Sequence, residues 1–401
     1  MQNGIHPETT PPAELTGRRV DLLITELYVG GAEKCITDLS LFLKSRGVLV
    51  RVISLASLPG SPNDGLVKRI RGAGIEVHSL GSNRVWNAVG AVLKLRGLLQ
   101  KSPPDVLQSF LFHANVIASA ALLGMRRRVP TGQPNSVTRP IRWVAGVRVA
   151  DPRPQRLAME AIAFRNADRV VAVSEGARLA YRAYSPIDSK RWLVIPNGID
   201  VNPVVSSELS WQSFGLPSDA SVMLFVGRLD AQKGVTWLID TASDWLCDLP
   251  KHHLVIAGRG DQQSLLKDRL TDLFAAKPEL NDRIHLIGWL DRPRQWMQIA
   301  EAILLPAQYE GMPNVCLEAM SESRPVVAFD VQGIRELLGQ PGDGQVVGVS
   351  ERSRWAQAIK DIAHDPQLRK ELGARNRSKI ESEFRLASQL EKYRKLYVEL
   401  L

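Results

Sequence analysis

The chain has 401 residues, of which 44% are hydrophobic and 23% charged, with a formal net charge of +9. This composition is typical of a soluble globular protein, and the length is too great for one ordinary core, so we expect two domains. Three widely separated cysteines exclude a disulfide framework, show no metal-type pairing and favour a reducing, cytoplasmic compartment.

Residues 1–18 contain no apolar segment, so we expect a disordered tail and no signal peptide. A continuous apolar run at 20–25 then predicts a strand buried on both faces. Gly30 and Gly31 form a turn before a helix that Gly47 closes. They fit a tight turn alone or a close backbone approach to a ligand, and neither a dinucleotide fingerprint nor a P-loop is present. Further strands are expected at 48–55, 75–79, 105–109, 141–145, 169–173 and 192–195.

Residues 106–125 carry no formal charge and are followed by three arginines, which is the length and flank of a membrane-spanning helix. However, the run contains Gln108, His113 and Asn115, and it follows two prolines. We therefore favour a buried strand, a short turn and a buried helix over a membrane span.

Turn residues at 196–200 indicate a linker between two domains. Beyond it the alternation of strands and helices restarts, which predicts a second doubly wound parallel sheet. After residue 349 the chain is expected to be helical to its end, with a break at Asp365 and Pro366. The strands expected in this half lie at 221–227, 254–258, 284–288, 302–306 and 325–329.

Two carboxylates, Glu310 and Glu318, lie eight positions apart in the segment QYEGMPNVCLEAMSESR. Gly311, Pro313 and Asn314 between them predict a turn followed by a helix start. Glu310 then lies in the loop before the helix, whose unpaired N–H groups favour an anion, and Glu318 lies more than one turn into it. By spacing alone, a loop residue and a solvated helix residue remain the simpler interpretation.

Other strand ends of this half carry Arg228 with Lys233, Gly258 with Gly260, and Gly288. In open α/β sheets, ligands bind outside the carboxyl ends of the strands, so we expect these residues to converge on one crevice. Two cations, a helix N-terminus and two carboxylates together favour a nucleoside diphosphate that carries a sugar.

Seven short segments of the chain match, in the same order, the motifs of one protein family. The chain resembles the family 4 glycosyltransferases, also called group 1 transferases, from about residue 20 to its C-terminus. The resemblance implies an α/β fold of the GT-B type, in which two Rossmann-like doubly wound parallel-sheet domains face a central cleft. The segments are GGAE at 30–33, SFLFHAN at 109–115, VSEG at 173–176, IPNGID at 195–200, GRLDAQKG at 227–234, AGRG at 257–260 and EGMPNVCLE at 310–318.

In that fold we expect an acceptor-side domain at 19–198, a nucleotide-sugar-binding domain at 199–382, and a last helix at 383–401 that crosses back onto the first domain. Glu318 is similar to the family's ribose-binding carboxylate, and Glu310 to the one that contacts the donor sugar near the reacting centre. Arg228 and Lys233 resemble the pair that holds the diphosphate. The other expected donor-binding residues are Gly30, Gly31, Gly288, Gly311, Met312, Pro313 and Asn314.

His113 is the fourth candidate catalytic residue, beside Glu310, Arg228 and Lys233. The family often has two histidines three positions apart here, but this chain has Phe110 at the first position. A structural histidine and a catalytic one are about equally consistent with this pattern.

The resemblance implies transfer with retention of configuration. The chain has no Asp-x-Asp motif, and fixed cations can stabilise the charge that develops on the leaving diphosphate. We therefore expect a metal-independent hexosyltransferase that needs no cofactor and uses a UDP- or GDP-sugar. The alternatives are a non-catalytic nucleotide-sugar-binding scaffold, and an epimerase or phosphorylase of the same fold.

Twelve arginines and four acidic residues lie between Arg126 and Arg182, so this stretch carries nearly all of the excess charge. No RNA-binding aromatic signature or zinc finger accompanies it, so we expect an anionic membrane surface or a phosphorylated substrate and no nucleic acid. A solvated face remains the simpler interpretation. The predicted function is transfer to a lipid-linked or glycan acceptor in cell-envelope or exopolysaccharide synthesis, by a cytoplasmic enzyme at the inner face of the plasma membrane.

Overall fold

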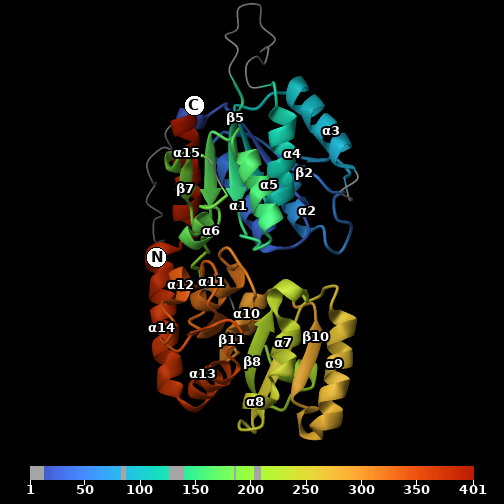
Figure 1. Cartoon of the computed structure of the whole chain (residues 1–401), viewed down its shortest axis with the longest axis vertical. Helices are drawn as coiled ribbons and strands as arrows, with labels where there is room; N and C mark the ends of the chain where they lie inside the picture. The colour runs from blue at the N-terminus through green and yellow to red at the C-terminus, as the bar shows by residue number, and fades with distance from the viewer. Residues whose placement is uncertain (1–12, 83–86, 126–139, 185–186, 203–208) are drawn as a thin grey trace, which may run out of the picture.

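The computed structural model describes residues 13–82, 87–125, 140–184, 187–202 and 209–401. Its two α/β domains lie one above the other (Figure 1). The upper one contains a seven-stranded parallel sheet in the order β3-β2-β1-β4-β5-β6-β7, and the lower one a six-stranded parallel sheet in the order β10-β9-β8-β11-β12-β13. This is the predicted pair of Rossmann-like domains.

The seven predicted strands of the first half are confirmed, with ends shifted by one or two residues. They are β1 (Arg19–Ile24), β2 (Leu49–Ser54), β3 (Glu76–Ser79), β4 (Val106–Phe110), β5 (Arg142–Val147), β6 (Arg169–Ala172) and β7 (Trp192–Val194). Side chains of β1 alternate between two cores, as the two-residue period of a strand requires. Leu22 and Ile24 pack under α1 (Gly31–Ser45), α2 (Gly65–Gly72) and α15 (Leu386–Leu400). Leu23 packs under the helices of the opposite face, α3 (Ala88–Lys101), α4 (Phe112–Leu122), α5 (Pro154–Phe164) and α6 (Glu175–Ala180).

The second sheet has one strand more than the sequence predicted. Its strands are β8 (Ser221–Val226), β9 (His252–Ala257), β10 (Ile284–Gly288), β11 (Ala302–Leu305), β12 (Val326–Phe329) and β13 (Val346–Val347). The missed strand, β13, pairs with β12 through only two residues between glycines, so no period could reveal it. The helices are α7 (Val235–Asp240), α8 (Ser243–Leu246), α9 (Gln263–Ala276), α10 (Pro293–Met297), α11 (Asn314–Ser321), α12 (Ile334–Leu338), α13 (Arg352–His364) and α14 (Pro366–Glu383).

The expected disordered tail is wrong for residues 13–18. Ala13–Leu15 form a 3₁₀ turn, Leu15 is buried, and Arg18 pairs with Asp105 at 3.3 Å. Residues 1–12 lie outside the described residues. Within the described residues, no helix combines the length and the apolar character needed to cross a membrane. The segment 106–125 is the predicted strand and helix, β4 followed by α4.

The C-terminal helices connect the two domains. Asp365 caps α14 by accepting a hydrogen bond from the Leu368 amide, which is why the helical run breaks there. α14 packs against α11 and α13 of the second domain, whereas α15 packs against α1 of the first. Ile199 forms a parallel bridge with Arg385, so the chain crosses between the domains twice at one place.

Candidate functional site

The loop after β8 and the loop after β11 bring a cation and a carboxylate together. Lys233 Nζ lies 2.5 Å from Glu310 Oε1, and Glu310 is only 4% exposed. Gly234 follows with a φ of +68°, and a Cβ there would lie 2.1 Å from the Pro306 carbonyl oxygen. Only glycine therefore lets the two loops pack closely enough to form the pair. Lys233 has two further N–H donors for a ligand.

Arg228 lies at the same strand end but is turned to solvent. Its side chain is 66% exposed and lies 3.2 Å from Asp230 Oδ2, and it donates to Gln232 Oε1 at 3.2 Å. Gln232 in turn donates to the Tyr309 carbonyl oxygen at 3.0 Å, which joins this loop to the Glu310 loop. Exposed pairs of this kind contribute little energy, so the Arg228 side chain is free to turn toward an anion.

Glu318 lies on the second turn of α11, as predicted, with Pro313 as the residue before the helix. Its partner is Lys34 on α1, whose Nζ lies 2.9 Å from Glu318 Oε1. The candidate ribose-binding carboxylate is therefore held by a cation from the opposite domain. A carboxylate has about four lone-pair sites, so Glu318 can accept hydrogen bonds from Lys34 and from a ligand together.

Gly30 and Gly31 have little room for a Cβ, and Gly31 lies against the start of α11. Asn314 Nδ2 donates to the Gly31 carbonyl oxygen at 3.1 Å, and a Cβ on Gly31 would lie 3.1 Å from the same nitrogen. On Gly30, a Cβ would lie 2.3 Å from Glu33 Oε2. Gly31 therefore approaches the start of α11 closely, and the expected approach of these two glycines to a ligand stays a prediction.

Gly311 and Met312 are used at the domain interface. A Cβ on Gly311 would lie 2.1 Å from the Arg148 carbonyl oxygen, and the Gly311 carbonyl accepts a hydrogen bond from Ser174 at 2.7 Å. The Met312 carbonyl accepts from Asn197 Nδ2 at 2.9 Å. These groups were predicted to bind the donor, and the structure gives each of them a contact with the first domain.

The other two candidates lie on β10 and α4. Gly288 ends β10 with a φ of +73°, and its carbonyl accepts from the Gly258 amide at 2.7 Å. His113 is the second residue of α4 and packs edge-on against Phe112. Partial desolvation and then the charge of Arg156 lower the pKa of His113, so it is neutral near pH 7.

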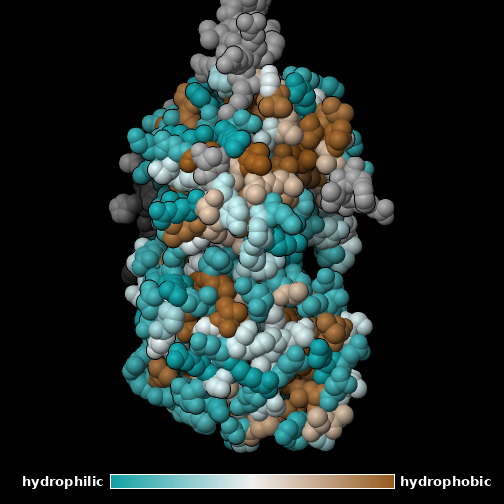
Figure 2. All heavy atoms as spheres, in the orientation of Figure 1, coloured by the Kyte–Doolittle hydropathy of each residue, from teal (hydrophilic) through white to brown (hydrophobic). Residues whose placement is uncertain are grey.

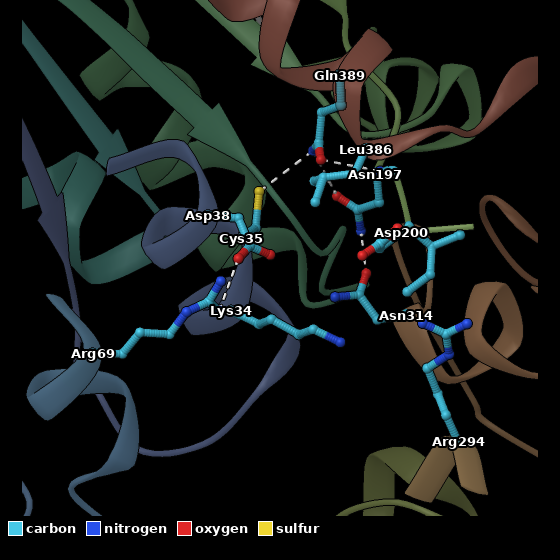
Figure 3. Close-up of a pocket in the computed structure, with 12 residues that line it drawn as sticks. Lys34, Cys35, Asp38, Arg69, Asn197, Asp200, Arg294, Asn314, Leu386 and Gln389 are labelled. Atoms are coloured by element: carbon cyan, nitrogen blue, oxygen red, sulfur yellow. Dashed lines mark hydrogen bonds and ion pairs between the residues drawn. The ribbon is translucent and has the colours of Figure 1, made fainter. Parts of the chain in front are cut away.

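A polar cavity of about 230 Å³ opens between the domains (Figure 3), and Lys34, the partner of Glu318, is one of its lining residues. Lys34, Cys35 and Asp38 line it from α1, and Asn314 lies opposite them. Gln389 of α15 closes it by donating to Cys35 Sγ at 3.3 Å. The volume is below that of typical ligand pockets, so a nucleotide sugar needs additional space in the cleft.

Two family models match the chain, one in each half. Residues 29–203 match the model described as Glycosyltransferase Family 4, and residues 220–365 match Glycosyl transferases group 1. The chain belongs to the family 4, group 1 glycosyltransferases. The resemblance inferred from the seven motifs is thereby confirmed, and so is the GT-B fold.

Individual relatives of this glycosyltransferase agree with the family models. It is 25% identical over 356 residues to the lipopolysaccharide core biosynthesis glycosyltransferase LpsE of Rhizobium meliloti, covering 88% of this chain and 92% of that one. It is 26% identical over 223 residues to an Escherichia coli UDP-Gal:alpha-D-GlcNAc-diphosphoundecaprenol alpha-1,3-galactosyltransferase, covering 54% and 56% of the two chains. Anabaena Alr3699/HepE, solved in complex with UDP-glucose, has a TM-score of 0.78 at 19% identity and covers 95% of this chain and 99% of its own.

The glycosyltransferase also buries charged residues that sequence reasoning missed. Arg148 is buried, donates to Asn197, and lies over the Phe110 ring at 5.9 Å. Glu33 is buried too, and desolvation raises the pKa of its carboxyl to about 7. Glu33 belongs to the motif GGAE and Asn197 to the motif IPNGID, so both residues lie in segments that the sequence analysis recognised. Neither motif, however, tells which residues of the other domain lie nearby.

The basic stretch from Arg126 to Arg182 is described only in part, because residues 126–139 lie outside the described residues. Local acids pair with several of its other arginines. Arg142 lies 3.5 Å from Asp168, and Arg178 pairs with Glu175. Arg148 is buried. In the described part, neighbouring acids therefore neutralise several of these arginines, and the positive charge is not spread evenly over one face.

Proposed function

We propose that this glycosyltransferase moves a hexose from a nucleoside-diphosphate sugar to a lipid-linked or glycan acceptor, with retention of configuration and without a metal. The contact that supports this best is the Lys233–Glu310 pair at the carboxyl ends of the strands, in the same cleft as Glu318. An ammonium group and a buried carboxylate are thereby held together beside the start of α11.

The proposed roles follow from the charges that the reaction creates. Negative charge builds on the diphosphate as its bond to the sugar breaks, and preorganised donors aimed at that charge usually make the largest contribution to the rate. Lys233 and Arg228 supply these donors in place of a metal. Glu310 accepts a hydrogen bond from the donor sugar, and Glu318 accepts hydrogen bonds from the ribose hydroxyls.

UDP- or GDP-sugars are the proposed donors, and UDP is favoured by the relatives. The HepE protein was solved with UDP-glucose, and the E. coli relative is named for UDP-Gal and a diphosphoundecaprenol acceptor. The LpsE relative is named for lipopolysaccharide core biosynthesis. These names support a place in cell-envelope or exopolysaccharide synthesis.

Thermal shift with UDP-, GDP- and ADP-sugars, with and without EDTA, tests the donor proposal. We expect one nucleotide class to raise the melting temperature by the same amount in both conditions. A shift that disappears with EDTA would contradict metal independence. A shift with one donor but no release of nucleotide would favour the scaffold alternative, and no shift with any donor would contradict the donor proposal. Conversion of the donor without transfer to an acceptor would favour the epimerase or phosphorylase.

Peripheral contact of this cytoplasmic enzyme with an anionic membrane surface is part of the proposal. Hydrophobic side chains gather on the upper domain around α3 and α4 (Figure 2). The exposed ones on α3–α6 and the segments that follow these helices are Val89, Leu93, Leu123, Met159, Ile162, Leu179 and Tyr184. Exposed cations such as Arg165 and Arg182 lie on the same series of helices. Apolar side chains beside cations are suited to the surface of an anionic leaflet.

Flotation with phosphatidylglycerol vesicles tests the membrane contact. We expect the protein to float with these vesicles at low salt and not with phosphatidylcholine vesicles. Replacing Leu93 and Ile162 by Ser should release it, whereas Leu265→Ser, on the exposed side of α9 in the other domain, should not. Equal flotation of both variants would contradict this face as the contact.

A further inference from the structure

We infer that Arg153 and Arg156, at the start of α5, form a binding subsite for a phosphate group of the acceptor. The inference rests on the proposed function, because it concerns the second substrate of the same cleft. Neither arginine belongs to any of the seven motifs that carry the resemblance to the family.

The backbone places the two arginines beside the reacting centre. Val149 forms an antiparallel bridge with Gly311, the residue after Glu310. The chain then runs only four residues from Val149 to Arg153, where α5 begins. The charged groups at the start of α5 also affect the pKa of Tyr309, the residue before Glu310. Desolvation and then Asp151 raise the pKa of its phenol, whereas Arg153 lowers it. The start of α5 therefore forms one side of the cleft next to the Glu310 loop.

One carboxylate holds both guanidinium groups in place. Arg153 Nε donates to Asp151 Oδ1 at 2.8 Å, and Arg156 Nη1 donates to Asp151 Oδ2 at 3.0 Å. Arg156 is also held over the Phe112 ring at 4.8 Å. Because two guanidinium groups share a single carboxylate, one positive charge remains, and several of their ten N–H donors stay free.

The geometry favours a tetrahedral oxyanion as the ligand. The Arg153 and Arg156 side chains are 58% and 35% exposed, whereas Asp151 is 12% exposed and lies behind them. Forked donors that are already ordered match the oxygens of a phosphate and lose little entropy on binding. Arg178 on α6 gives a contrast, because it pairs one-to-one with Glu175 and leaves no excess charge.

The next turns of α5 extend this subsite with apolar side chains. Met159 and Ile162 follow Arg156 at intervals of three residues, and both are more than half exposed. A phosphate held by the arginines therefore has apolar surface on the side away from the cleft. A lipid phosphate fits both parts of this surface, and a soluble sugar phosphate fits the arginines alone.

Binding in the presence of saturating UDP tests the subsite, because UDP occupies the diphosphate site of the donor. The two probes are phosphatidylcholine vesicles containing undecaprenyl phosphate, and soluble glucose 1-phosphate. We expect the wild-type enzyme to bind at least one probe, and R153A/R156A to bind it roughly tenfold more weakly or less, as loss of two charge-assisted contacts implies. Binding of the vesicles alone identifies a lipid phosphate, and binding of both identifies the phosphate group itself.

R269A is the control, because Arg269 is an exposed arginine of α9 in the other domain and lies outside the face proposed to contact the membrane. It should bind both probes as the wild type does. R153K/R156K keeps the charge and the Asp151 partner but removes the forks, so a folded protein with weakened binding is expected.

The affinity for UDP distinguishes a failure of the proposed subsite from a failure of the proposed function. If UDP binds normally but R153A/R156A retains phosphate binding, or if the wild type binds neither probe, the subsite is wrong and the proposed function stands. If R269A weakens binding equally, general charge and not this subsite is responsible. Absence of UDP binding by the wild type would overturn the proposed function itself.

Discussion

Lys233 and Glu310 pair within the C-terminal domain, whereas Glu318 pairs with Lys34 across the cleft. The first pair joins two loops that follow strands of one sheet, and both loops carry recognisable motifs. The second joins α1 and α11, whose contact depends on how the two domains pack. The C-terminal domain therefore holds Lys233 and Glu310 together by itself, whereas the pair of Glu318 and Lys34 depends on the contact between the two domains.

Each domain also buries a titratable group, which is an acid in the N-terminal domain and a base in the C-terminal domain. The N-terminal domain buries Glu160, to which Asn115 and Tyr181 donate hydrogen bonds. The C-terminal domain buries His253, whose Nδ1 lies 3.1 Å from His285 Nε2. Burial disfavours the charged form in both cases, so it raises the pKa of the acid and lowers that of the base. At these two sites the stability of the domains should therefore respond oppositely to pH.

Replacing Lys233 by Ala should have the largest effect. It removes a cation from the developing diphosphate charge and leaves Glu310 buried without its partner. We expect kcat to fall by about 10²–10³-fold, the range seen when one preorganised electrostatic donor is lost. Initial rates of nucleotide release measure this. Lys251→Ala, an exposed lysine before β9 at the opposite end of the sheet, is the control. A wild-type rate in Lys233→Ala would remove the site assignment.

Replacing Glu318 by Ala should weaken nucleotide binding by roughly tenfold to a hundredfold, the loss expected for hydrogen bonds to a charged acceptor. Lys34→Ala should have a smaller effect, because a partly exposed ion pair contributes only about 0–1 kcal/mol. Calorimetric titration with UDP measures both. Glu279→Ala, exposed before β10, should bind normally. If Lys34→Ala weakens binding more than Glu318→Ala, the nucleotide is held mainly by the N-terminal domain.

Replacing Glu160 by Gln should reverse a pH-dependent loss of stability. Desolvation raises the pKa of Glu160 from 4.5 to about 7, despite the hydrogen bonds from Tyr181 and Asn115, which lower it. The folded state thus binds more protons than the unfolded state between these values, so stability falls as pH rises from about 4.5 to 7. The expected loss is on the order of 2 kcal/mol.

Melting temperatures at pH 5 and pH 8 measure this effect. The variant should gain on the wild type between the two values, and the exposed Glu399→Gln should not. A constant difference between Glu160→Gln and the wild type would mean that Glu160 titrates normally in the folded protein.

His253→Asn should give a smaller change of opposite sign. Desolvation and then His285 lower the pKa of His253 from 6.5 to about 4. The unfolded state binds the extra proton between these values, so wild-type stability falls as pH decreases from about 6.5 to 4. We expect about 1 kcal/mol, because the site is not fully desolvated. Urea midpoints at pH 7 and pH 4.5 measure it. A wild type that loses no more stability than the variant would contradict the opposite pH responses of the two domains.

The sequence by itself determined the family, the two-domain fold and every strand of the two sheets except β13. Apolar runs such as 20–25 and the Gly–Pro–Asn turn before α11 are local signals, because strand burial and helix starts depend on neighbouring residues. A two-residue strand such as β13 has no such signal. The 3₁₀ turn with buried Leu15 was missed because its partners lie elsewhere in the chain.

Only the tertiary structure decided which groups of the two domains meet. Lys34 with Glu318, and Asn197 with Met312 and Asn314, are separated by more than a hundred residues. The two arginines of α5 are held by a nearby acid, but their place beside Glu310 depends on the bridge between Val149 and Gly311. Such contacts depend on the packing of whole domains, which no local period or motif encodes.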